Sequence, residues 1–128
     1  MGLTQPSVVS ITASQTDAAG NTGTSTPFAF GVDTYAPIVI ISSVGGSDST
    51  ISGLQADQVA IGTAEPNGSV SIFSGLNLLG TAIADANGNW SYQFTAANIT
   101  TIGQGTGKSI TASQSDAAGN TGTSTPFA

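Results

Sequence analysis

The sequence contains no cysteine and no histidine. Without cysteine there is neither a disulfide framework nor a thiolate metal site, so stability has to come from the core or from bound ions. Without histidine, zinc sites built on imidazole and imidazole acid-base catalysis are excluded. These two absences remove the commonest routes to a metalloenzyme or a hydrolase.

Basic residues are almost absent, because Lys108 stands alone against seven acidic residues and the net charge is −6. This balance argues against partners such as nucleic acids or anionic membranes, since phosphate neutralisation needs Lys and Arg. No apolar run approaches the roughly 18 residues of a membrane helix, so no membrane insertion is expected. No signal peptide follows Met1, and we expect an internal piece of a longer protein. The acidic excess favours a divalent cation such as Ca²⁺.

Catalytic residue types are equally scarce. Without His, Cys or Arg, an enzyme would need a carboxylate pair or a Ser-Lys dyad, and Lys108 begins an expected strand. Residues 103–109 (GQGTGKS) resemble a phosphate loop superficially, but they lack its spacing and lead into a strand rather than a helix. We therefore predict that the protein is not an enzyme.

A repeat dominates the sequence. Residues 10–29 read SITASQTDAAGNTGTSTPFA and residues 109–128 read SITASQSDAAGNTGTSTPFA, so that only Thr16 and Ser115 differ. The copies lie 99 residues apart, as Ile11 and Ile110 show. This period is too long for a solenoid turn and suits a whole sandwich domain. The chain is thus expected to be one full repeat preceded by the tail of another.

Two domains follow from this period. Residues 33–128 are predicted to form a complete domain, and residues 1–32 the last two strands of a preceding repeat with the start of the linker. The near-identity of the copies indicates a tandem array, with neighbouring identical repeats as partners. An isolated hairpin is marginal in water, so we expect the partial repeat to pair with a neighbouring sheet edge or another chain, or to be partly disordered.

Short alternating segments, punctuated by Gly, Asn and Asp, follow Pro37 at spacings of roughly ten residues. This pattern predicts an all-β, seven-stranded, Ig-like Greek-key sandwich. The strands are expected at 38–44, 58–62, 69–74, 78–84, 89–95, 108–115 and 121–127, with a single helical turn at 96–102. Trp90, Tyr92 and Phe94 share one face of their strand, so they are predicted core anchors rather than exposed aromatics for ligand stacking.

Acidic residues fall in turns that antiparallel succession places at one end of such a sandwich, beside the incoming linker. Packed carboxylates repel, and a Ca²⁺ ion with six to eight oxygen ligands would offset that repulsion. Side-chain amide oxygens could complete the shell. The predicted metal ligands are Asp33, Glu65, Asp85, Asn87, Asp116 and Asn120. The alternative for each loop is plain turn chemistry, because Asp and Asn cap their own backbone and Gly tolerates positive φ.

Four segments in succession carry a family resemblance: VDTYAP at 32–37, IGTAEPNGSV at 61–70, DANGNW at 85–90 and TASQSDAAGN at 111–120. In this order they resemble the bacterial Ig-like extender repeats of giant type I secreted surface adhesins, which include RTX-type, biofilm-associated and ice-binding ones. The resemblance implies an extracellular location at the bacterial cell surface. It maps Asp33, Asp85 and Asp116 onto the family's Ca²⁺ positions, whereas Glu65 rests on the loop argument alone. Tyr35 departs from the family, which more often has a small residue there.

The expected function is structural. An ion that bridges the linker to the loops would remove inter-domain bending, so that the array projects adhesive domains from the cell as a rod. The alternative is a carbohydrate- or protein-binding Ig-like module that acts through the loops at one pole. It would need exposed aromatics in the loops, and the aromatics here lie mainly on strands. An enzyme accessory domain is disfavoured by such faithful repetition.

Overall fold

The computed structural model describes residues 7–128 of the chain. The chain divides into two compact units, and the division falls between Tyr35 and Ala36. We call residues 7–35 the hairpin unit and residues 36–128 the sandwich unit. The predicted partial repeat falls in the hairpin unit, except for its residues 1–6, which lie outside the described residues. Asp33 falls on the hairpin side of the division.

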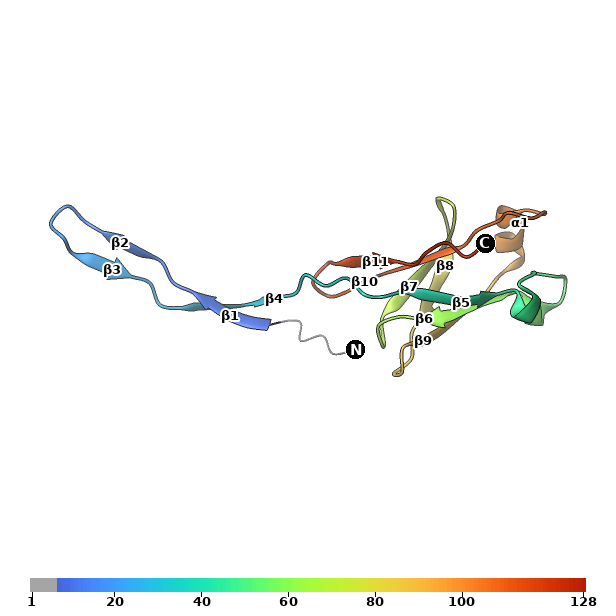
Figure 1. Cartoon of the computed structure of the whole chain (residues 1–128), viewed down its shortest axis with the longest axis horizontal. Helices are drawn as coiled ribbons and strands as arrows, with labels where there is room; N and C mark the ends of the chain where they lie inside the picture. The colour runs from blue at the N-terminus through green and yellow to red at the C-terminus, as the bar shows by residue number, and fades with distance from the viewer. Residues whose placement is uncertain (1–6) are drawn as a thin grey trace. The chain divides into compact units, whose positions relative to one another are not determined.

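The sandwich unit is built from two antiparallel sheets (Figure 1). The first has the order β5-β6-β9, with β5 at Ile40–Val44, β6 at Val59–Thr63 and β9 at Asn89–Gln93. The second has the order β11-β10-β7-β8, with β7 at Ser69–Ser74, β8 at Asn77–Ile83, β10 at Thr111–Ser115 and β11 at Thr121–Thr123. The predicted all-β Ig-like sandwich is confirmed.

The last two strands are shorter than the sequence predicted. Beyond them Ser124 N–H donates to the Ala112 carbonyl at 2.8 Å, and an isolated bridge joins Ile110 to Phe127. The ladder is interrupted because the Ala112 amide donates to the side-chain oxygen of Ser124 at 3.0 Å. Pro126, which has no backbone N–H, lies in the same interruption.

The core of the sandwich lies between the two sheets. It comprises Val39, Val44, Ala60, Val70, Ile72, Ala82, Ala84, Trp90, Phe94, Ile110 and Ala112. On β9, Trp90 and Phe94 are 3% and 2% exposed, and Tyr92 between them is half-buried. The rings of Tyr92 and Phe94 meet edge to face, with centroids 5.4 Å apart. Gly62 lies beneath the indole of Trp90, because a Cβ there would come within 2.6 Å of the ring.

Short helical segments close the connections of the sandwich. The segments η1 (Gly46–Asp48) and η2 (Gln55–Asp57) lie between β5 and β6, and α1 (Ala96–Ile102) follows β9 at the predicted place. A reciprocal capping box starts α1, since Asn98 N–H donates to the Thr95 hydroxyl and Asn98 Oδ1 accepts from Thr95 N–H. The Asn98 side chain is buried and also binds the Tyr92 hydroxyl at 2.6 Å and the Leu79 carbonyl at 3.1 Å. This network ties α1 to β8 and β9.

The hairpin unit consists of two short antiparallel ladders in one continuous hairpin. They are β1 (Ser7–Ile11) with β4 (Phe28–Val32), and β2 (Ser14–Thr16) with β3 (Thr22–Thr24). All side chains of β2 and β3 are exposed. Ile11 and Phe28 are 60% and 69% exposed, so the described part of this unit has no core of its own.

The two sequence copies fold into the same hairpin. Ser14 pairs with Thr24 as Ser113 pairs with Thr123, 99 residues later in each strand. The bond that interrupts the ladder is also repeated, because the Ala13 amide donates to Ser25 Oγ at 2.9 Å. The register is therefore encoded within the twenty residues themselves and does not need the rest of a sandwich.

Candidate functional site

Two of the predicted acidic loops lie side by side in the sandwich unit. Ala64 N–H donates to the Gly88 carbonyl at 2.8 Å, and Asn67 N–H donates to the Asp85 carbonyl at 3.2 Å. These backbone bonds hold the loop that carries Glu65, between β6 and β7, against the loop between β8 and β9. The predicted convergence of these two loops therefore has a backbone basis.

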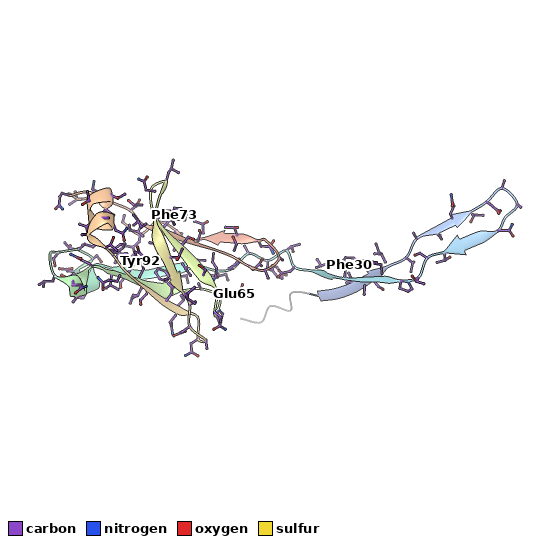
Figure 2. The ribbon with its side chains drawn as sticks, turned by 180° about the vertical axis from the view of Figure 1, so that it is seen from behind. Phe30, Glu65, Phe73 and Tyr92 are labelled. Atoms are coloured by element: carbon purple, nitrogen blue, oxygen red, sulfur yellow. The ribbon has the colours of Figure 1, made fainter. Side chains whose placement is uncertain are left out.

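Gln114 on β10 connects a third element to these loops. Its amide oxygen accepts from Glu65 N–H at 3.0 Å, and its amide nitrogen donates to the Glu65 carbonyl at 3.1 Å. Gln114 is only 3% exposed, and Gly68 makes room for it, because a Cβ at Gly68 would collide with the amide group. The main chain of Glu65 is thus fixed while its side chain remains exposed, at the end of the sandwich unit away from α1 (Figure 2).

The carboxylates of Asp85 and Asp116 close their own turns. Oδ1 of Asp85 accepts from the backbone N–H groups of Asn87 and Asn89, both at 2.9 Å. Oδ1 of Asp116 accepts from Ala118 N–H at 3.0 Å and from Asn120 N–H at 2.9 Å. These are the contacts expected from turn chemistry, the alternative that the sequence left open for each loop.

Asp116 and Asp17 have depressed pKa values for local reasons. The side-chain amide of Asn120 donates to Asp116 Oδ2 at 3.1 Å, and this bond lowers the pKa of Asp116 below its ordinary value of 3.8. In the hairpin unit, the backbone N–H of Asn21 is the main cause of the lowered pKa of Asp17, followed by its side-chain amide. In both turns the hydrogen bonds favour the ionised carboxylate.

Asp116→Asn should therefore make the sandwich unit less sensitive to acid. A depressed pKa contributes stability that is present above the pKa of the unfolded chain and is lost as pH falls through the folded value. We expect the melting temperature of the parent to exceed that of the variant at neutral pH, and the gap to close as pH falls below the ordinary value of 3.8. Melting would be followed by circular dichroism in a chelator.

Asp17→Asn is the matched control, because it changes the same turn in the hairpin unit and should leave the melting of the sandwich unit unaltered. A gap for Asp116→Asn that stays constant on acidification would mean that the carboxylate charge does not support this turn.

The acidic side chains do not form a shared cage. Among residues 7–128, no group of three or more Asp or Glu side chains is close enough to hold a metal ion. Asp33, in the hairpin unit, accepts from Tyr35 N–H at 3.2 Å. The Asn87 side chain is exposed, and the Asn120 amide donates to Asp116. The Ca²⁺ site with Asp33, Glu65, Asp85, Asn87, Asp116 and Asn120 stays a prediction. An ion would need backbone and amide oxygens besides carboxylates.

Gln114 is the residue at this end of the sandwich that sequence analysis missed. It shares a strand face with Ile110 and Ala112, which are both buried. The alternation of apolar and polar residues along this strand therefore indicated that the Gln114 amide faces the core. A buried amide needs hydrogen-bond partners, and the neighbouring turn backbone is the nearest source of them.

A comparison with known families bears on this unit. The family described as the bacterial Ig domain matches residues 47–128, which include β6 to β11 and all three loops. A search of curated proteins finds no match. Domains of this family are typically non-enzymatic parts of extracellular surface proteins. In the described part of the chain, no helix has the length and apolar character to cross a membrane. The chain belongs to the bacterial Ig domain family.

Proposed function

We propose that this chain is a structural extender repeat of a bacterial surface adhesin. One observation carries the proposal: the last hairpin of the sandwich unit recurs 99 residues earlier with the same register and the same turn bonds. The twenty repeated residues form the end of a domain, so they indicate a tandem array, and in such an array each further copy adds one sandwich to the length.

The loop chemistry supports a spacer over a binding module. Carbohydrate binding through the loops would use exposed aromatic side chains, and residues 64–68, 85–89 and 116–120 contain no aromatic residue. The aromatic residues Trp90 and Phe94 are buried instead. These loops offer carboxylates, amides and backbone oxygens, which are ligands for a hard cation.

We further propose that Ca²⁺ stiffens the junction between repeats. Its ligands would be drawn from Asp33 of the linker and from the loops of Glu65, Asp85 and Asp116. Two of these loops are already joined by backbone bonds, and Gln114 links Glu65 to the strand that leads into Asp116. A carboxylate offers about four lone-pair sites, so an oxygen that closes a turn can still coordinate an ion.

Calcium should raise the melting temperature of the protein by several degrees over the same sample in a chelator. The reason is that an ion that binds only the folded state stabilises it by RT ln(1 + c/Kd), where c is the free calcium concentration, and this term grows as free calcium rises above the dissociation constant. Scanning calorimetry would measure the shift. Mg²⁺ should not reproduce it, because that smaller ion demands near-ideal octahedral geometry and gives up water reluctantly.

Asp33→Asn should remove most of the calcium shift, since it changes the linker ligand alone. Asp48→Asn is the matched control, because the Asp48 carboxylate accepts from Thr50 N–H, and the Thr50 hydroxyl donates to the Asp48 backbone carbonyl, in the connection after β5. Equal calcium shifts in both variants would refute the junction site while leaving the extender role open.

A further inference from the structure

The sequence contains two Asn-Gly steps, and they lie in the two loops that backbone bonds hold together. Asn67-Gly68 lies between β6 and β7, and Asn87-Gly88 lies between β8 and β9. Both asparagine side chains are exposed. Asparagine is one of the thermolabile residue types, and a following glycine has no side chain to shield its backbone nitrogen. Each step is therefore a candidate for deamidation.

Deamidation at such a step needs no enzyme. The backbone nitrogen of the glycine attacks the side-chain carbonyl carbon Cγ of the asparagine, a bond forms between these two atoms, and the Cγ–Nδ2 bond breaks. Ammonia leaves with the proton of the glycine N–H, and a cyclic imide remains. Water opens the imide at either carbonyl, to give aspartate or isoaspartate, whose main chain runs through Cγ. The reaction consumes water, and it requires that the glycine N–H leave its hydrogen bond.

The N–H of Gly68 is weakly held. It donates to the Glu65 carbonyl at 3.4 Å, beyond the usual range of about 2.7–3.2 Å for such bonds. The same carbonyl also accepts from Gln114 Nε2 at 3.1 Å, so two donors share it. Gly68 is only half-buried. A small local opening is thus enough to release this nitrogen.

The backbone conformation of Asn67 also favours opening. Its φ is +65°, in the left-handed region, as the second central residue of a type II turn requires. Among residues 7–128, only Ser49 and Asn67 have a positive φ without being glycine. This region is disfavoured for residues with a side chain, and asparagine tolerates it at a smaller cost. Opening the turn removes that cost.

The second Asn-Gly step is protected by contrast. Gly88 is buried, and its N–H donates to the Asp85 carbonyl at 3.0 Å. A Cβ on Gly88 would come within 2.6 Å of the Ala64 carbonyl oxygen, so the neighbouring loop encloses this glycine. Each glycine carbonyl accepts one backbone bond, at 2.9 Å for Gly68 and 2.8 Å for Gly88. The two steps therefore differ mainly at the glycine nitrogen.

We propose that Asn67 is a site of spontaneous deamidation in the folded protein, and that the fold protects the same dipeptide at Asn87. The reaction adds a negative charge to the loop that carries Glu65. An aspartate fits the turn, because Asp tolerates the left-handed conformation as Asn does.

An isoaspartate at this position changes the loop more severely, because it adds a carbon to the main chain. Asn67 N–H donates to the Ala84 carbonyl at 3.0 Å, and the Gly68 carbonyl accepts from Ala84 N–H at 2.9 Å. The added carbon lies between these two groups, so both bonds cannot persist. The isoaspartate form should accordingly be less stable than the parent.

The two dipeptides are internal controls for each other. The full chain would be incubated in a chelator at mildly alkaline pH, folded in one sample and unfolded by urea in the other. Chymotryptic digestion separates the two sites, since Phe73 and Leu76 lie between them, and mass spectrometry measures the deamidated fraction of each peptide. We expect Asn67 to react severalfold faster than Asn87 in the folded sample, and the two to react at similar rates in urea.

Variants identify the site and its products. Asn67→Gly retains a residue that accepts positive φ and removes the amide, so it should abolish most of the deamidation of the folded chain. Asn87→Ala is the matched control, because it reproduces Ala118 of the equivalent turn at 116–120, and it should leave the reaction unchanged. Methylation by an isoaspartate methyltransferase detects the isoaspartate form, which should melt below the parent, whereas Asn67→Asp should melt like the parent.

The comparison of rates can overturn the proposal in three ways. Equal rates at the two sites of the folded chain, or a faster reaction at Asn87, would refute the assignment. A folded chain that stays unmodified at Asn67 while the urea sample reacts would refute it equally. A preference for Asn67 that persists unchanged in urea would come from the local sequence, and it would refute the protection by the fold.

Discussion

Trp90→Ala should destabilise the sandwich unit by about 3–5 kcal/mol, the usual cost of removing a large aromatic side chain from a core. The indole is 3% exposed and packs over Gly62 on the neighbouring strand. The loss is comparable with the whole stability of many small domains, about 5–15 kcal/mol. Urea unfolding followed by far-UV circular dichroism would show the transition moving to much lower urea.

Trp90→Phe separates packing from polarity in the same position. The indole Nε1 is buried and has no hydrogen-bond partner among residues 7–128. An unsatisfied buried donor costs about 1–3 kcal/mol, and phenylalanine removes that cost while retaining an aromatic ring. We expect Trp90→Phe to lose far less stability than Trp90→Ala. Leu76→Ala, at a position that is 99% exposed, should change stability by no more than about 0.5 kcal/mol.

Equal losses for the alanine and phenylalanine variants would contradict this account of Trp90. Such a result would mean that the volume of the six-membered ring contributes little, and that the indole nitrogen is satisfied in solution.

Asn98→Ala should cost roughly 2–4 kcal/mol, which combines the loss of a helix cap with the loss of buried hydrogen bonds. One side chain caps α1 at Thr95, accepts from the Tyr92 hydroxyl at 2.6 Å and donates to the Leu79 carbonyl at 3.1 Å. Removing it leaves these groups partly unsatisfied inside the fold. The same urea experiment measures the change.

Thr100→Ala is the control for α1, because Thr100 is exposed and its hydroxyl binds only Ala96 within the helix. It should be close to neutral. A double-mutant cycle of Tyr92→Phe with Asn98→Ala should show coupling of about 0.5–3 kcal/mol, as residues in one hydrogen-bond network do. Strict additivity would mean that the Tyr92 hydroxyl does not depend on Asn98.

Period-two alternation was enough to predict the strands of the sandwich, since Trp90 and Phe94 on one face of β9 are indeed buried. It was not enough to predict where pairing stops. The ends of β10 and β11 depend on a hydrogen bond from the Ala112 backbone N–H to the side-chain oxygen of Ser124. Local alternation does not indicate where a side-chain oxygen replaces a backbone carbonyl as the acceptor. Propensity and pattern describe a strand, while its ends are decided by tertiary contacts.

The candidate site was harder to predict for a different reason. Asp85 and Asp116 have the residue types of both a turn former and a calcium ligand, so sequence could not choose between the two roles. The structure shows the turn bonds of both. It also shows that loop placement depends on Gln114, whose importance lies in two bonds to a backbone 49 residues away. Contacts at that sequence separation have no local signature.

The contact between Gly122 and Pro37 sets an order of events for folding. The two residues lie near opposite ends of the sequence of the sandwich unit, so their contact closes a loop of nearly the whole domain. Closing such a loop is slow compared with the formation of a hairpin, which takes about 1–10 μs. We therefore expect the final hairpin to form before it docks on the rest of the sandwich. If the chain belongs to a tandem array, as proposed, an undocked hairpin could pair with the wrong neighbour during that interval, and folding one repeat at a time would prevent this.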